Sequence, residues 1–504
     1  MGASRSHRAL AAVVSLAVGC MAAPALAGAA PPVAMGTGAA EAALEVAEDA
    51  LAPTPGSTPT VDPTLALAEL ADALPALSGP ERRRARALLA RPTDRGADRF
   101  GDGYAPGVEV RSAPSPEGNV CIVWATSGPD APDGAGGAGV PGYVEQIAAI
   151  AEHSRAVQVG ELGWRPPIAD GRAECGQPGQ ADVYLVELGS RGIFGYMATD
   201  PGQGGKRRKA GYLVVDNDYR PAQYPGFATP LAAARVTLAH EHNHLLQIAY
   251  SARQDAWLFE ATATWAEEHT YPGLDDWLRY VPAFARNPGV PLTAPWGAGG
   301  LKPYGAATWN HWLERRYGPE VIRRAWAASA QTSPRDFAVR AYGRSISAAG
   351  GPTFAAEFVR FAAASAEWRA GPLPNARRYA DVRRQGRFGR GETRTFRLHH
   401  TGYRLLHVYT RRGRALHLSA RAPRGLRFGL ALVARRGGSV RGRVVRRVRF
   451  VRRGGRASVR LRHPGRFDRV TAVVVNADAR ATGRRLGDWA YSKDSQRLRV
   501  NLGG

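Results

Sequence analysis

The sequence predicts an α+β protein in which a domain of strands followed by helices precedes a small all-β domain. Short runs of β-branched and aromatic residues at 119–125, 181–188 and 211–216 are typical of strands. After residue 230, apolar residues recur at three- and four-residue spacing, which is the period of helices. Beyond about residue 378 the runs alternate and are separated by Gly- and Arg-rich turns, which favours a β-sandwich.

The first 27 residues have the pattern of a secretory signal peptide. Arg5 and Arg8 precede an apolar run at 9–18, and residues 25–27 (Ala-Leu-Ala) form a small-residue cleavage site. The alternative is a lipoprotein signal in which Cys20 is acylated. No later run reaches the roughly 18 apolar residues that a spanning helix requires. We therefore expect a secreted or cell-envelope-associated protein with no transmembrane helix after signal cleavage.

The remainder of the chain divides into three parts. Residues 28–103 are a low-complexity leader rich in Ala, Pro and Thr, which is either a propeptide or a tether. Residues 104–370 are expected to form the domain of strands and helices, and residues 378–504 the Arg-rich β-domain. Helices are expected at 80–89, 144–157, 231–250, 256–269, 304–316, 319–330 and 353–369.

Nearly all of the excess positive charge lies in the last part of the chain. The formal net charge is +25, and residues 371–504 hold 35 Arg or Lys against six Asp or Glu. Only four of the 68 basic residues are Lys, so the arginines either reflect codon usage in a GC-rich genome or form a binding surface. Such a surface would attract anionic cell-envelope polymers or acidic substrates. No nucleic-acid partner is expected, because the exported chain has no recognition helix or base-stacking motif.

Two cysteines, Cys121 and Cys175, remain after signal cleavage. In an exported chain an even pair favours one disulfide bond. Two separate buried thiols are the alternative. Neither cysteine has the neighbours of a nucleophile or of a zinc knuckle.

Three histidines and a glutamate fall within residues 240–244, on the helix expected at 231–250. His240 and His244 are four residues apart, so their imidazoles lie on one face and can bind one Zn²⁺. Glu241 follows the first of them, where its carboxylate can reach a water on the ion. His242 sits about 200° around the helix from His240 and cannot share that ion.

A catalytic zinc site needs a third protein ligand and an open position. One known arrangement places Gly three residues and His six residues after the second histidine, but this chain has Gln247 and Tyr250 there. The other arrangement takes a Glu from the following helix. Glu260 stands one turn into the helix expected at 256–269, after Asp255 as a possible N-cap, and is the predicted third ligand.

Other candidates near the motif have structural alternatives. Glu267 and Glu268 are interpreted as a solvated helix end, with Glu267 as a support for a ligand histidine being the alternative. Tyr304 is either a stabiliser of the reaction's oxyanion or a core or capping aromatic. His269 and His311 are more typical of structural histidines.

The segment VTLAHEHNHLLQIAYSARQDAWLFEATATWAEE (236–268) resembles the active-site region of gluzincin metallopeptidases, the thermolysin-like superfamily. It is closer still to secreted bacterial metalloproteases with an H-E-x-x-H-x-x-Q…W-x-x-E-x-x-A-x-W-x-E pattern, and the likeness extends over about 115–330. The resemblance implies His240, His244 and Glu260 as zinc ligands and Glu241 as general base. Tyr304 resembles the tyrosine of gluzincin aminopeptidases. Position 264 is Thr where thermolysin has an acidic residue, so the resemblance does not say what orients the first histidine.

These observations predict a secreted zinc metalloendopeptidase that hydrolyses peptide bonds with Glu241 as general base. The alternative from another class is a non-catalytic envelope-binding or adhesion protein that retains a structural zinc site. A third option keeps the zinc but hydrolyses another amide or an ester. In a peptidase, the strand in 211–219 would edge the cleft and pair with an extended peptide, and residues 216–218 would form the turn that ends it.

Overall fold

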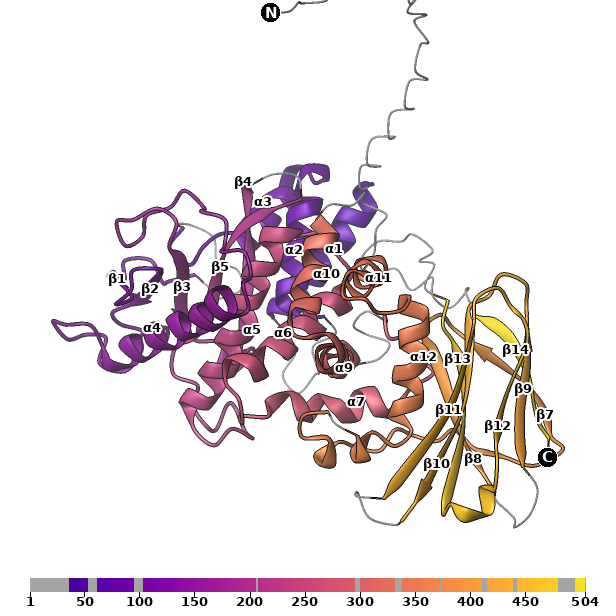
Figure 1. The fold of residues 1–504 in the computed structure, drawn as a ribbon. Coiled ribbons are helices and arrows are strands. Elements are labelled where there is room, and N and C mark those ends of the chain that lie inside the picture. Colours follow the sequence, from indigo (N-terminus) through magenta and orange to yellow (C-terminus); the bar gives the residue numbers. More distant parts are fainter. Residues whose placement is uncertain are drawn as a thin grey trace, which may run out of the picture. The chain divides into compact units, whose positions relative to one another are not determined.

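A five-stranded mixed sheet positions the candidate site (Figure 1). The inner strands β2, β3 and β5 are parallel to one another, and β1 and β4 run antiparallel at the two edges. In spatial order the strands are β1 (Val110–Pro114), β2 (Val120–Ala125), β3 (Ala181–Val186), β5 (Lys209–Asp216) and β4 (Gly195–Gly204).

The protein is described here by a computed structural model. The predicted signal peptide and Cys20 lie outside the described residues. The described residues are 36–52, 61–94, 103–204, 207–294, 300–330, 338–371, 373–409, 415–437, 442–478 and 495–503.

The three predicted strands are the inner strands of the sheet. β5 is buried on both faces from Ala210 to Asp216, as an inner parallel strand must be. The prediction that the strand in 211–219 pairs with an extended peptide is therefore wrong, because β5 is already paired with β3 on one side and β4 on the other. The edge strand is β4, whose second half lacks a β-branched run. Asp216 does end β5 in a turn, because its carboxylate accepts backbone N–H groups of Leu188 and Gly189 as well as those of the turn itself.

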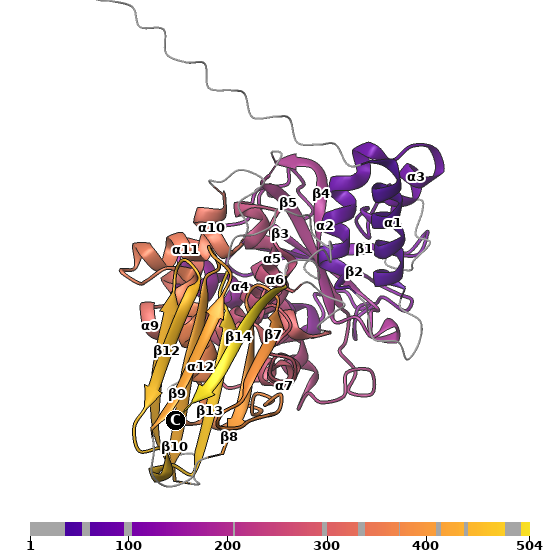
Figure 2. The ribbon, with the colours of Figure 1, turned by 90° about the vertical axis from the view of Figure 1, so that its right-hand side faces the viewer.

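Helices cover both faces of this sheet (Figure 2). One face, with Ile122 and Leu213, packs against α4 (Gly142–Arg155) and α5 (Pro230–Tyr250). The opposite face, with Tyr184 and Tyr212, packs against three helices of the predicted leader. These are α1 (Thr37–Leu51), α2 (Pro63–Ala73) and α3 (Gly79–Leu88). Of these three leader helices, only α3 matches a helix expected from the sequence.

Helix α5 begins at a well-formed N-terminus and runs close to the edge strand. Thr229 caps it by accepting the N–H of Ala232, and Pro230 occupies the first turn, where no backbone donor is needed. Gly195 of β4 allows the close approach, because a Cβ there would lie 2.7 Å from Cγ2 of Thr237. The candidate ligands on α5 are therefore held beside the edge of the sheet.

The remaining helices follow α5 in chain order. The helix expected at 304–316 is divided at Ala306 into α8 and α9, and the one expected at 353–369 ends at Ser365. They are α6 (Ala256–Thr270), α7 (Val281–Arg286), α8 (Lys302–Gly305), α9 (Ala307–Tyr317), α10 (Glu320–Ala330), α11 (Ala338–Ala348) and α12 (Phe354–Ser365).

Two facing sheets form the C-terminal region, as the alternating pattern predicted. Their orders are β11-β10-β13-β8-β6 and β12-β9-β14-β7, and Leu432 and Leu418 are among the residues of the core that joins them. The strands are β6 (Arg387–Phe388), β7 (Thr393–Leu398), β8 (Gly402–Val408), β9 (Leu416–Ala422), β10 (Phe428–Arg436), β11 (Arg443–Val451), β12 (Gly455–Leu461), β13 (Arg469–Asn476) and β14 (Gln496–Gly503). The α+β fold class is confirmed.

The outer face of the first of these two sheets packs on α12. Gly429 of β10 lets the two approach, since a Cβ there would lie 2.4 Å from side-chain carbons of Val359. Residues on both sides of the predicted boundary near 370 belong to one hydrophobic core, which contains Phe358 and Val433. The division into two domains stays a prediction.

Cys121 and Cys175 form a disulfide bond, with Cα atoms 5.7 Å apart, so the predicted pairing is confirmed. It ties β2 to the loop that leads into β3. Among the residues that the structure describes, none lies in a helix long and apolar enough to cross a membrane.

Candidate metal centre

Helices α5 and α6 bring the predicted ligands together. His240 and His244 lie one turn apart on α5, with ring centroids separated by 4.6 Å. Glu260 lies in the second turn of α6 and is fully buried. Asp255 occupies the N-cap position as predicted, but its carboxylate accepts the backbone N–H of Ala338 instead of capping α6.

The three side chains converge on one point. Oε2 of Glu260 lies 3.2 Å from Nε2 of His240, and Oε1 of Glu260 lies 3.8 Å from Nε2 of His244. One ligand atom from each residue lies within 4.8 Å of the others. In the part of the chain that the structure describes, this is the only group of three such side chains placed to hold a metal ion.

The hydrogen bonds around the group fit a bound cation. Nε2 of His244 and Oε1 of Glu260 are buried and have no hydrogen-bond partner, although buried polar atoms normally have one. Two nitrogens and a carboxylate oxygen are also a ligand set that zinc accepts. The residues present therefore suit a zinc ion bound through the Nε2 atoms.

Each ligand histidine is held through its other nitrogen. Nδ1–H of His240 donates to Oε1 of Glu267 at 2.6 Å, and Nδ1–H of His244 donates to Oε1 of Gln247 at 2.8 Å. These bonds orient both rings so that their Nε2 atoms face Glu260, where a metal ion would bind. The interpretation of Glu267 as a solvated helix end is wrong, because it is only 4% exposed and orients His240.

The sequence offered a signal for both supporting residues. Glu267 lies two turns after Glu260 and so on nearly the same face of α6, and Gln247 lies three residues after His244. In the sequence, Gln247 argues against a third histidine ligand and belongs to the H-E-x-x-H-x-x-Q pattern, but neither observation predicts a contact with His244. In the structure its amide nitrogen also donates to Asn243 and to the backbone carbonyl of Phe259, which links α5 to α6.

Glu241 is buried beside the ligand group but is not part of it. It is 4% exposed, and its Oε2 accepts a hydrogen bond from the Thr64 hydroxyl at 3.1 Å. Burial raises the pKa of Glu241 to about 8, and repulsion from Asp62 and Glu260 adds to the effect, against the opposing charge of His240. A carboxylate with a raised pKa next to a metal site is suited to moving a proton near neutral pH.

Burial and charge act differently on the two ligand histidines. Burial lowers the pKa of His244 to about 4, so its imidazole is neutral and ready to bind a metal. Burial also lowers the pKa of His240, but hydrogen bonds to Glu260 and Glu267 outweigh it and hold the pKa well above its ordinary value. Repulsion between buried carboxylates, among them Glu241 and Glu260, also contributes here, and a divalent cation would relieve it.

Tyr304 lies against the ligand group. Its ring stacks on the ring of His240 at 5.6 Å, with an angle of 21° between the planes. Its hydroxyl donates to Oδ2 of Asp62 at 3.0 Å, and the residue is 8% exposed. The side chain predicted as an oxyanion stabiliser is thus next to the site, but its proton is directed at a residue of the leader.

The other histidines lie away from the ligand group. Nδ1 of His242 contacts Oε1 of Gln158 at 3.1 Å, and burial lowers the pKa of His242 to about 3. His269 and His311 both lie against Glu314. His242 therefore does not join the ligand group, as helical spacing predicts, and His269 and His311 contact a glutamate outside that group.

No protein-family model matches the chain, and no curated protein is detectably similar to it. Functional evidence therefore comes from the side chains of α5 and α6 and from what surrounds them.

Proposed function

We propose that the protein is a secreted zinc metallopeptidase that hydrolyses peptide bonds. The observation that carries the proposal is the pairing of a buried His240/His244/Glu260 group with a separate carboxylate, Glu241, that makes no contribution to the ligand set. A purely structural metal site has no use for such a group. The disulfide bond supports export, since such bonds persist in oxidising compartments.

The chain's own residues would divide the reaction among them. A zinc ion bound by the three ligands would polarise a carbonyl group and make water more acidic. Glu241 would take a proton from the attacking water and return it to the leaving amine. The Tyr304 hydroxyl, once released from Asp62, would donate a hydrogen bond to the oxyanion. The edge strand β4 would accept an extended peptide as an added strand.

Hydrolysis of an unstructured protein by the mature chain tests this function. We expect activity that is lost on chelation, restored by zinc and absent in Glu241→Gln, with the metal still bound in that variant. Metal bound at one equivalent without turnover of any peptide, amide or ester would instead support a binding protein with a structural zinc site. Turnover of an ester or a non-peptide amide alone would correct the substrate class.

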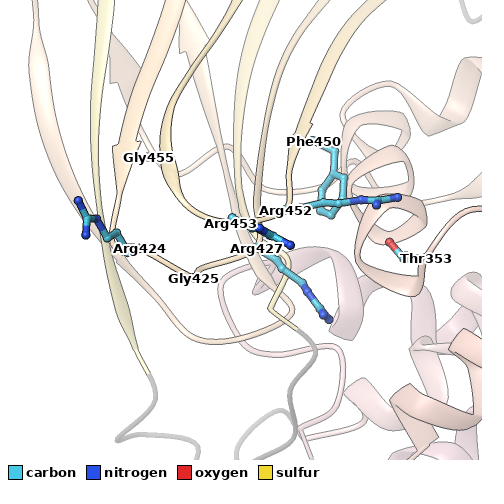
Figure 3. A pocket seen from close by; sticks show the side chains of 8 residues that line it. All are labelled: Thr353, Arg424, Gly425, Arg427, Phe450, Arg452, Arg453 and Gly455. Carbon is cyan, nitrogen blue, oxygen red and sulfur yellow. The ribbon is translucent and has the colours of Figure 1, made fainter.

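The proposal extends to the Arg-rich region, which we expect to bind anionic cell-envelope polymers. Arg424, Arg427, Arg452 and Arg453 line a hollow of about 830 Å³ beside α12, and no acidic residue lines it. In Figure 3, Arg424 extends away from the other three arginines. A second hollow of about 670 Å³ is lined by five further arginines and one histidine, again without an acidic residue. Arg384 of the second hollow pairs with Glu367, which does not line it. Positive charges gathered in hollows that no acidic residue lines favour a polyanion.

Retention on an immobilised anionic polymer tests this partner. We expect elution at lower salt for a double variant, Arg427→Gln with Arg452→Gln, since binding of this kind weakens as salt screens the charges. The matched control is Arg83→Gln with Arg86→Gln, which removes the same charge from exposed positions of α3. Equal elution of both double variants would show that net charge alone, and not this region, determines binding.

A further inference from the structure

The candidate catalytic groups are covered by residues at the start of α2, which belongs to the predicted leader. Glu241, His240 and Tyr304 are each less than a tenth exposed. The residues of the leader that contact them are Asp62 and Thr64. These contacts join parts of the chain 177 and 242 residues apart, so only the folded protein creates them.

Thr64 occupies two groups that a peptide substrate would need. Its hydroxyl donates to Oε2 of Glu241 at 3.1 Å and accepts the backbone N–H of Met197 at 3.0 Å. Met197 lies on β4, and an amide that points away from the sheet at an edge strand is the donor with which an added peptide strand pairs. One side chain thus contacts both the candidate base and the candidate substrate-binding edge.

Asp62 occupies a further group that catalysis would need, the hydroxyl of Tyr304. Its Oδ2 accepts the hydroxyl proton of Tyr304 at 3.0 Å, and its Oδ1 accepts the N–H of Thr64 at 2.8 Å, which caps α2. A tyrosine hydroxyl has one proton to donate. While it is donated to Asp62, Tyr304 is not available to an oxyanion.

Packing holds α2 across the edge of the sheet. Leu65 belongs to the core shared by α5 and α6, whereas Leu67 and Leu70 belong to the core on the opposite face. At the far end of α2, Asp72 pairs with Arg253, which lies between α5 and α6, at 2.6 Å. The start of α2 therefore lies on the side of the catalytic helices, and an extended peptide along β4 would compete with it for the same position.

We propose that residues 61–67 are an autoinhibitory segment, and that substrate gains access only when the start of α2 leaves the edge of β4. Inhibition of peptide hydrolysis by this segment rests on the proposed peptidase function. The contacts by which Asp62 and Thr64 cover the site are a property of the fold and do not depend on that function. The segment blocks by occupying the donors and acceptors that binding and catalysis require. A segment that only positioned the catalytic groups would behave differently, because loosening it would lower turnover.

Two variants loosen the cover at different places. Thr64→Val keeps the shape of the side chain and removes the hydroxyl from Glu241 and Met197. Asp72→Asn weakens the ion pair with Arg253 at the far end of α2 and touches no candidate catalytic group. The control is Glu48→Gln, which removes an ion pair with Arg84 inside the leader. Thermal unfolding of each full-length variant establishes that it folds.

Two measurements distinguish the loss of the covering contacts from a change in the catalytic groups. The first is kcat/KM for a peptide. It is expected to rise about tenfold or more in Thr64→Val, because the variant loses two buried hydrogen bonds and the loss of one alone produces a shift of about that size. It is expected to rise about twofold in Asp72→Asn, as for an exposed ion pair. The second is the rate at which a chromogenic chelator removes zinc from the loaded protein, expected to rise in the same order. Glu48→Gln should match the wild type in both.

Each outcome decides the proposal. A fall in kcat/KM in Thr64→Val with unchanged zinc release would show that Thr64 positions Glu241, and would overturn it. Zinc release unchanged in both Thr64→Val and Asp72→Asn would also overturn it. If no form of the protein hydrolysed a peptide, the proposed function would fail, whereas faster zinc release in the two variants would still show that the segment covers the site.

Discussion

Replacing Glu267 by glutamine tests whether the second carboxylate of α6 supports the metal centre. Glu267 is 4% exposed, and its Oε1 accepts a hydrogen bond from Nδ1 of His240 at 2.6 Å. Glutamine has nearly the same size and keeps one acceptor oxygen. The change therefore removes the charge and leaves the packing, so we expect weaker zinc binding in a protein that still folds.

The size of the effect follows from this bond. A hydrogen bond to a charged group contributes about 1.5–3 kcal/mol, and loss of a residue that orients a metal-binding histidine lowers metal affinity about 10- to 100-fold. At about 1.4 kcal/mol for each factor of ten, the two ranges agree. Because glutamine keeps an acceptor, we expect the zinc dissociation constant to rise by about 10- to 30-fold, the lower part of that range.

Competition with a chromogenic chelator of known affinity measures the dissociation constant. The matched control is Glu268→Gln, the neighbouring position on α6, which is half-buried and does not touch the ligand histidines. We expect the control to bind zinc as the wild type does. An unchanged dissociation constant in Glu267→Gln, or an equal loss in both variants, would refute the assignment of Glu267 as the residue that orients His240.

Other contacts of the fold lead to further predictions. Glu241→Gln is expected to lower kcat about 10²- to 10⁴-fold, the usual contribution of a general base, with wild-type zinc content by atomic absorption. Arg91→Met would leave three buried aspartates without their cation and is expected to cost about 3–5 kcal/mol in urea unfolding; a wild-type midpoint would contradict this. Reducing Cys121–Cys175, separated by 54 residues, is expected to cost about 4 kcal/mol, seen as a lower melting temperature. Burial alone would raise the pKa of Glu314, but hydrogen bonds from two histidines hold that pKa below its ordinary value of 4.5. Its contribution to stability is therefore present above pH 4.5 and lost as the pH falls through the folded-state pKa, and Glu314→Gln should show a shallower loss of stability in acid titrations.

Local patterns predicted the inner strands, the helices α5 and α6 and the candidate site residues on them. The spacing of His240 and His244 places their imidazoles on one face of any intact helix, because helical geometry is set by the backbone. Glu260 was predicted because the chain between α5 and α6 is short enough to return a second helix to the first. The disulfide bond was predicted from an even cysteine pair in an exported chain.

The edge strand β4 and the helices α1 and α2 were not predicted from the sequence. β4 was missed because its second half, Asp200–Gly204, has turn-like composition, and its pairing with β5 overrides local preference. The helices α1 and α2 were read as low complexity, because alanine-rich segments show little contrast between buried and exposed faces. Their buried positions are set by the sheet face they cover.

The sequence by itself determined which candidate groups are present: two imidazoles, a candidate third ligand and a separate carboxylate. The spacing of the two histidines places their imidazoles on one face of a helix, whatever that helix packs against. Only the tertiary structure decided how these groups are supported and covered. Glu267 became a support for His240 because α6 packs against α5. Thr64 and Asp62 reached Glu241 and Tyr304 because α2 packs across β4. Contacts between residues so far apart in the chain depend on how buried faces fit together, and no local pattern encodes that fit.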